Sequence, residues 1–176
     1  MELVREMENK EGLASHAISE ELEEHNAQVI KKYDSSGASS KKVKQGYMVN
    51  DESQVVRVRS MDDDHFLTIK SNTRGLSRFE FEYKIPKEDA QDMFKNLCGP
   101  SIIEKTRHYI KTSNHTWEID EFHDQNQGLI VAEIELKAED EKFHIPNWIF
   151  KEVTTQSKYY NMNLIKNPYC DWKDTL

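Results

Sequence analysis

A chain of 176 residues is long enough to bury one hydrophobic core without disulfides or oligomerisation, so we expect a single domain. Its 24 Lys and Arg against 32 Asp and Glu give a net charge of −8, which argues against broad binding to nucleic acid or acidic membranes. The opening residues lack the apolar core of a signal peptide and no run approaches the roughly 20 apolar residues of a membrane span, so we expect a cytoplasmic protein.

The N-terminal segment, residues 1–40, differs in pattern from the rest of the chain. Residues 1–33 are rich in Glu and are predicted to be helical, because the stretch SHAISEELEEHNAQVIKKY has apolar residues at near-helical spacing. The small polar residues of DSSGASSKK, residues 34–42, predict a loop. We therefore divide the chain into a helical or poorly ordered segment over 1–40 and a folded domain over 41–170.

Short strands with turn signals between them are predicted from about residue 41 to residue 137. One helix interrupts them in PKEDAQDMFKNLCGP: Pro86 marks its start, Glu88 and Asp89 suit its first turn, and Gly99 follows its end. After Asp140, the segments PNWIFKEVT (146–154) and SKYYNMNLI (157–165) predict short helices. The fold class is therefore mainly β with flanking helices.

The predicted strands share one feature, which is charged residues two positions apart. Side chains alternate along a strand, so residues at i and i+2 lie on one face. These charged faces carry Arg57 and Arg59; Thr68 and Lys70; Arg78, Glu80 and Glu82; Lys105 and Arg107; Glu118 and Asp120; and Glu133 and Glu135. The opposite faces are apolar, and we expect them to pack outward against helices.

Two arrangements explain such charged faces. A sheet that curls its charged face inward forms a barrel with a charged lumen and no exposed edges. Its cations then require an anion and its carboxylates require a cation, and a polyphosphate with Mg²⁺ or Mn²⁺ supplies both. The alternative from pattern alone is a lattice of cross-strand salt bridges on an open sheet.

Seven segments together resemble the CYTH domain, that is, the triphosphate tunnel metalloenzyme family, and in particular its short bacterial tripolyphosphatase-like branch. They are RVRS, TIK, GLSRFEFEY, EKTRHY, TWEIDEF, VAEIELKAEDEKF and KEVTTQSKYYNMNL, and they agree in order and spacing over residues 43–168. The resemblance implies an antiparallel eight-stranded β-barrel tunnel that binds a linear triphosphate and Mg²⁺ or Mn²⁺ and hydrolyses a phosphoanhydride.

The resemblance also implies roles for individual residues. The phosphate-binding residues would be Arg57, Arg59, Lys70, Lys105 and Arg107, and the metal ligands would be Asp120, Glu133 and Glu135. Glu80 and Glu82 match carboxylates beside the water and metal sites, and Glu118 matches a charged lumen position. In KQGYM, Tyr47 matches a tyrosine that pairs with a lysine near the attacking water.

The chain departs from the family at its N-terminus, where the family has an ExExK strand of the type EIERKFLV. The best-spaced substitute is ELEEH, with Glu21 and Glu23 as further metal ligands but His25 in place of lysine; ELVRE, residues 2–6, is a poorer one. If residues 16–33 form a helix, Glu21 and Glu23 point about 200 degrees apart and cannot share a metal. We therefore expect weak activity or none.

Inorganic tripolyphosphate is the first choice of substrate. Related tunnel enzymes use thiamine triphosphate or nucleoside triphosphates, or cyclise ATP to cyclic AMP, and the sequence leaves these open. A catalytically weakened module that binds polyphosphate or a nucleotide is the alternative outside the enzymes. A small-molecule triphosphate is the expected partner, nucleic acid and membrane are not, and a homodimer is left open.

Overall fold

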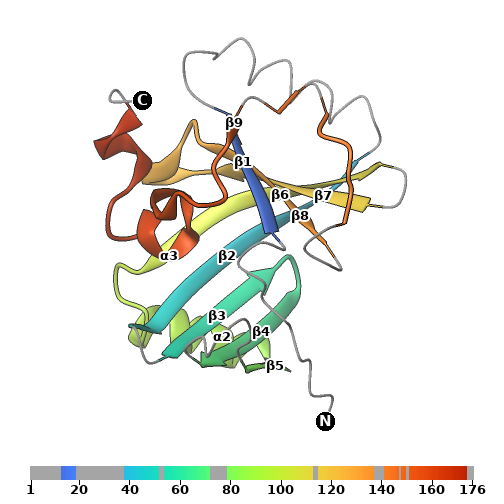
Figure 1. Ribbon diagram of the computed structural model, residues 1–176. Coiled ribbons are helices and arrows are strands. Elements are labelled where there is room, and N and C mark those ends of the chain that lie inside the picture. Colours follow the sequence, from blue (N-terminus) through green and yellow to red (C-terminus); the bar gives the residue numbers. More distant parts are fainter. Residues whose placement is uncertain are drawn as a thin grey trace. The chain divides into compact units, whose positions relative to one another are not determined.

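A computed structural model describes residues 13–18, 38–51, 54–71, 79–112, 115–136, 141–146, 148–149 and 151–173 (Figure 1). The chain divides into two compact units. The described part of the first unit lies within residues 42–104, and that of the second comprises residues 13–18, 38–41 and 105–173. Each unit is described by itself.

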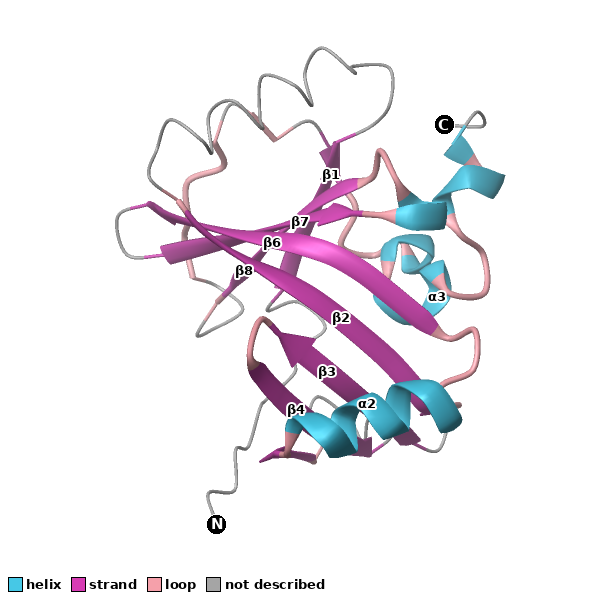
Figure 2. Cartoon of the chain, turned by 180° about the vertical axis from the view of Figure 1, so that it is seen from behind, coloured by secondary structure: helices cyan, strands magenta, loops and turns pink. Residues whose placement is uncertain are grey.

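The first unit is an antiparallel sheet with one helix. Its strands are β2 (Ser39–Asn50, from residue 42 onward), β3 (Gln54–Met61), β4 (Asp64–Ser71) and β5 (Glu80–Lys84), in the order β5-β4-β3-β2. The helix α2 (Lys87–Asn96) begins after Pro86, as predicted, with Glu88 and Asp89 in its first turn. Figure 2 shows α2 lying across these strands.

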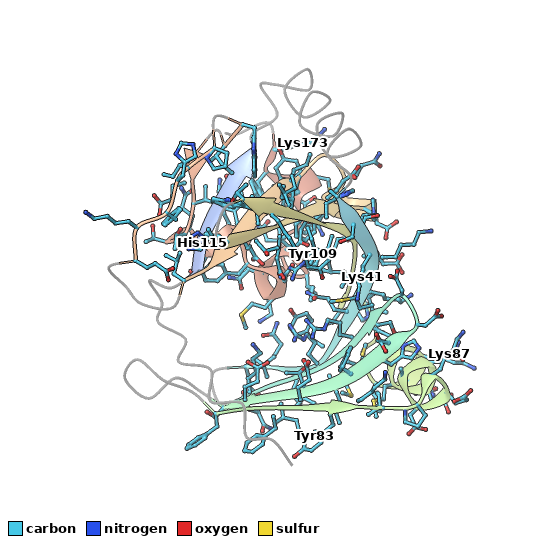
Figure 3. The ribbon with its side chains drawn as sticks, turned by 90° about the vertical axis from the view of Figure 1, so that its right-hand side faces the viewer. Lys41, Tyr83, Lys87, Tyr109, His115 and Lys173 are labelled. Carbon is cyan, nitrogen blue, oxygen red and sulfur yellow. The ribbon has the colours of Figure 1, made fainter. Side chains whose placement is uncertain are left out.

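The apolar face of this sheet is covered only in part. Val58 of β3 is fully buried with Ala90 of α2 and Cys98, as the alternating pattern predicts. However, Phe81 and Tyr83 of β5 are 37% and 44% exposed, and Phe79, just before the strand, is 56% exposed, so the expectation that every apolar face packs against a helix is wrong there. Figure 3 shows Tyr83 projecting outward from the strand. The helix is short and β5 lies at the edge of the sheet. The ten residues of α2 contact β3 and β4, and β5 is the outermost strand beyond β4.

The second unit is also an antiparallel sheet. Its strands are β6 (Ile102–Thr112, from residue 105 onward), β7 (His115–Phe122), β8 (Ile130–Glu135), β1 (Leu13–Ile18) and β9 (Lys151–Glu152), in the order β6-β7-β8-β1-β9. Short helices follow β7 and β9: η2 (Asp124–Asn126), η3 (Ser157–Tyr159), α3 (Asn161–Leu164) and η4 (Tyr169–Asp171). The core contains the apolar side chains of β7 and β8, packed around Trp117 and Trp148, whose rings meet edge to face at 5.7 Å.

Two helix predictions are corrected in this unit. Residues 13–18 form strand β1 rather than a helix, because their backbone pairs with β8 and such non-local pairing overrides a helical spacing of apolar residues. Residues 151–152 form β9 against β1 rather than a helix. The helix predicted near 157–165 is confirmed by η3 and α3. The rest of the predicted N-terminal helix, with Glu21 and Glu23, lies outside the described residues.

The fold is therefore mainly β and antiparallel, with few helices. Among the described residues, no helix is both long enough and apolar enough to cross a membrane. The separation of 1–40 from 41–170 as domains stays a prediction.

Candidate functional site

One face of β2–β5 in the first unit carries five charged side chains together with a tyrosine and a threonine. We call them the first charged cluster: Tyr47, Arg57, Arg59, Thr68, Lys70, Glu80 and Glu82. Register explains the gathering, since Tyr47, Arg57, Thr68 and Glu82 lie directly opposite one another along four neighbouring strands. Residues directly opposite in an antiparallel sheet share a face, so this row is fixed by the backbone pairing.

The carboxylates of this cluster are ion-paired with its cations. Arg59 Nη2 lies 2.9 Å from Glu82 Oε2, and Lys70 Nζ lies 2.7 Å from Glu80 Oε2. The guanidinium of Arg59 also lies over the ring of Phe66, 5.5 Å from its centroid. Both predicted catalytic glutamates are thus held beside predicted phosphate-binding residues.

Tyr47 is buried on the same face. Its hydroxyl accepts a hydrogen bond of 3.1 Å from Nε2 of Gln45, which is also buried and lies two residues earlier on β2. The pairing of β2 with β3 shifts by one residue between Tyr47 and Val49. Such a bulge bends the strand and redirects side chains. The side chains of β2 therefore alternate between the two faces of the sheet from Val43 as far as Tyr47, and the bulge interrupts this alternation after Tyr47.

The second unit contains a tighter group, the second charged cluster: Lys105, Arg107, Glu118, Asp120 and Glu133. Asp120 lies at its centre. Its carboxylate accepts a hydrogen bond of 2.5 Å from Lys105 Nζ and two of 2.7 Å from Nε and Nη2 of Arg107. Each oxygen of the carboxylate therefore bonds to one of these two arginine nitrogens. Arg107 Nη2 also lies 3.2 Å from Glu133 Oε2, and Nη1 contacts Glu118. Lys105 and Asp120 are almost completely buried.

Burial and ion pairing act against each other here. Burial raises the pKa of Asp120, but Lys105 and Arg107 outweigh it and bring the pKa down to about 2. Burial lowers the pKa of Lys105, with Asp120 opposing the shift. Burial and the negative charge of Asp120 raise the pKa of Glu133, despite the nearby cations. The cluster thus has a firmly ionised centre and a carboxyl at its rim that is easier to protonate.

Arg107 separates two carboxylates that face each other. Glu118 and Glu133 are directly opposite on β7 and β8, a position in which like charges repel. The guanidinium contacts both and so reduces the repulsion between them. Mg²⁺ and Mn²⁺ prefer oxygen ligands, so the carboxylates on these two strands are chemically suited to a hard divalent cation. Across the described residues, however, no group of three His, Cys, Asp or Glu is arranged to hold a metal ion.

Of the predicted metal ligand Glu135, the structure gives the position along the strand. Glu135 follows Glu133 by two residues on β8, and its register partner is Leu13. β1, the neighbour of β8, has the sequence LASHAI, which contains no acidic residue. Leu13, Ser15 and Ala17 occupy the register positions opposite Glu135, Glu133 and Val131.

Two residues that hydrogen bond within or to these clusters were not among the predicted site residues. Thr68 hydrogen bonds to both Arg57 and Glu82, and its position two residues before Lys70 on a charged face was the available signal. Asn161 of α3 accepts a hydrogen bond of 3.3 Å from Lys105 Nζ, and no sequence signal links a residue 56 positions away to that lysine.

Comparison with known proteins adds to this geometry. The family model described as the CYTH domain matches residues 5–169. An inorganic triphosphatase of Acetivibrio thermocellus is 44% identical over 131 residues, which are 74% of this chain and 84% of the relative.

Solved structures agree on the fold. A crystal structure of an inorganic triphosphatase superposes with a TM-score of 0.62 at 22% identity, covering 87% of this chain and 95% of its own. A candidate adenylate cyclase of Bacillus halodurans superposes with a TM-score of 0.57 at 14% identity, covering 77% and 83%. At these identities the likeness concerns the antiparallel fold alone.

Proposed function

Because this chain belongs to the CYTH domain family, we propose that it is an inorganic triphosphatase, which hydrolyses the phosphoanhydride bonds of tripolyphosphate with a divalent metal ion. The observation that carries the proposal is the 44% identity to an inorganic triphosphatase over most of both chains. Thiamine triphosphatase and adenylate-cyclase activities stay as alternative reactions of the same site.

The two charged clusters support the proposal chemically. In this proposal the strands close into an eight-stranded tunnel whose lumen is lined by their charged faces. Arg57, Arg59, Lys70, Lys105 and Arg107 bind the phosphate oxygens. Nε of Arg57 is buried and has no hydrogen-bond partner within the part of the chain that the structure describes, so this guanidinium keeps a donor for an anion.

Asp120, Glu133 and Glu135 would hold Mg²⁺ or Mn²⁺, with Glu118 facing Glu133 across β7 and β8. When bound, such an ion neutralises phosphate charge as it develops in the transition state. Glu80 and Glu82, together with Tyr47, would orient the attacking water and accept its proton. Arg57 and Arg59 would hold the terminal phosphate in line with that water.

A second candidate function is a weakened module that binds a polyphosphate or a nucleotide without turnover. The observation that favours it is the sequence of β1, since the strand beside Glu133 contributes no carboxylate and no lysine. The family's ExExK strand would supply both.

A phosphate-release assay tests the proposed activity. Purified protein is given tripolyphosphate, thiamine triphosphate or ATP, each with Mg²⁺ or Mn²⁺, and released phosphate is measured. We expect tripolyphosphate to be hydrolysed fastest and Arg57→Ala to lose about a hundredfold or more in rate. Lys44→Ala is the matched control, because Lys44 pairs with Glu104 and lies over Phe94 of α2, outside both clusters. Equal rates for Arg57→Ala and the native chain would remove the assignment.

The register of β1 offers a test that separates enzyme from binding module. Replacing Leu13 and Ser15 by Glu and Ala17 by Lys builds an E-x-E-x-K pattern opposite Glu135, Glu133 and Val131. We expect the triple variant to hydrolyse tripolyphosphate at least tenfold faster than the native chain. The matched control replaces Leu13 and Ser15 by Gln and Ala17 by Met, which keeps the size of the new side chains at the same positions and removes their charges. Equal rates for the two variants would show that β1 does not complete the site.

A further inference from the structure

Thr68 occupies the centre of the first charged cluster. It lies on β4, between Arg57 on β3 and Glu82 on β5, and none of its surface is exposed. Its partners across the neighbouring strands, Arg57 and Glu82, are both charged, so a small buried hydroxyl at this position needs an explanation beyond strand propensity.

The hydroxyl connects a cation to a carboxylate that do not bond directly. Nη2 of Arg57 donates to Thr68 Oγ1 at 3.3 Å, and Oγ1 donates to Glu82 Oε2 at 2.9 Å. Arg57 Nη2 and Glu82 Oε2 are themselves 3.8 Å apart, too far for a hydrogen bond. Glu82 is bound on its other side by Arg59 at 2.9 Å.

We propose that Thr68 is a positioning residue that keeps Arg57 apart from Glu82 while fixing the orientation of both. The inference rests on the proposed function, in which Arg57 binds phosphate and Glu82 orients water. Arg57 and Glu82 form an ion pair at 3.8 Å, but a direct hydrogen bond between them would use the guanidinium donors that a phosphate needs. The hydroxyl accepts one of them and leaves Nε of Arg57 without a partner among the described residues.

The role differs from catalysis and from packing. Thr68 is fully buried and its hydroxyl both accepts and donates a hydrogen bond, so it acts on substrate only through its two neighbours. Valine has the same shape without the hydroxyl, and serine has the hydroxyl without the methyl group. Comparing the two separates the hydrogen bonds from the packing.

The experiment measures three variants of the full-length protein, Thr68→Val, Thr68→Ser and Thr106→Val. Thr106 is the matched control, because its hydroxyl also bonds to a neighbouring side chain, His123 at 2.8 Å, but lies outside both clusters. Binding of tripolyphosphate without metal is measured by calorimetry, and kcat and KM by phosphate release with Mg²⁺.

We expect Thr68→Val to weaken tripolyphosphate binding about tenfold and to raise KM by a similar factor, since hydrogen bonds to charged groups are worth that much or more. Thr68→Ser and Thr106→Val should remain within about threefold of the native chain. The inference would be overturned if Thr68→Val bound tripolyphosphate with the affinity and KM of the native chain. It would also be overturned if Thr68→Ser lost as much affinity as Thr68→Val. If Thr68→Val does not fold, Thr68→Ala replaces it with the same expected result.

The proposed function and this inference fail differently. If the native chain binds tripolyphosphate but does not hydrolyse it, the enzyme assignment fails and the calorimetric comparison still decides on Thr68. If the native chain hydrolyses tripolyphosphate and Thr68→Val matches it in both measurements, only the inference on Thr68 falls. If the native chain neither binds nor hydrolyses it, both fall.

Discussion

Asp120→Asn should destabilise the second unit severely at neutral pH. The substitution keeps the size of the side chain but removes the charge that Lys105 and Arg107 share. Lys105, which is only 2% exposed, would then keep its positive charge in the interior without its carboxylate partner. Breaking a buried ion pair by removing one partner costs about 3–5 kcal/mol, so we expect a loss of that size in the free energy of unfolding.

The pH dependence of this loss follows from the pKa of Asp120. Folding lowers that pKa from 3.8 to about 2. A depressed carboxyl pKa stabilises the folded state above its unfolded value, and this stabilisation is lost as the pH falls from about 4 toward 2. A shift of this size corresponds to about 2 kcal/mol. The difference between native chain and variant should therefore shrink by about that amount between pH 6 and pH 2.5.

Urea unfolding followed by tryptophan fluorescence is the assay. All three tryptophans, Trp117, Trp148 and Trp172, belong to the second unit, so the signal reports on the part that contains Asp120. Glu121→Gln is the matched control on the same strand, because its carboxylate is partly exposed and lies 3.5 Å from Nε2 of His108. It should cost less than about 1 kcal/mol. A loss below about 1 kcal/mol for Asp120→Asn at pH 7 would refute the reasoning.

Three further outcomes are expected. Gly46→Ala should lower the unfolding free energy by about 1–3 kcal/mol, because a Cβ there would lie 2.6 Å from Sγ of Cys98 and 3.1 Å from the ring of Phe94; an unchanged thermal midpoint would contradict the close packing of α2 on β2. Removing divalent metal with EDTA should stop phosphate release and adding Mg²⁺ should restore it, whereas release that continues in EDTA would exclude a metal-dependent reaction. Phe79→Ser should change the unfolding free energy by less than about 0.5 kcal/mol, since this ring is more than half exposed; a loss above 2 kcal/mol would show that the ring is packed.

The sequence predicted the strands best where charge and apolarity alternate strictly. Arg57 and Arg59 alternate with Val56 and Val58, and the structure places these residues on β3 with Val58 buried and both arginines ion-paired. A period of two is a local property, so it can be found without knowing what the strand pairs with. The same holds for β7, where Trp117 and Ile119 enter the core.

The first strand could not be predicted in this way. Residues 13–18 have neither alternation nor charge, and they form β1 because their backbone pairs along the whole of β8. The signal therefore belongs to the partner strand. The exposed ring of Phe81 has a similar cause, since alternation shows which residues share a face but not whether a helix is long enough to cover it.

The pairing within the clusters also depends on register. The sequence shows that Arg107 and Asp120 lie on charged faces, but only the pairing of β6 with β7 puts them directly opposite each other. Asp120 was predicted as a metal ligand, and the structure shows it hydrogen bonded to Lys105 and to Nε and Nη2 of Arg107.

The central claim is that the charged faces of these strands hydrolyse a linear triphosphate. Phosphorus NMR of tripolyphosphate incubated with the full-length chain and Mg²⁺ tests it most directly, because it shows which bond breaks. We predict that the tripolyphosphate signals decline while pyrophosphate and orthophosphate first appear in equal amounts, and that Arg57→Ala abolishes the change while Lys44→Ala does not. Tripolyphosphate that persists unchanged with the native chain, under conditions where calorimetry shows it bound, would contradict the claim and leave a binding module.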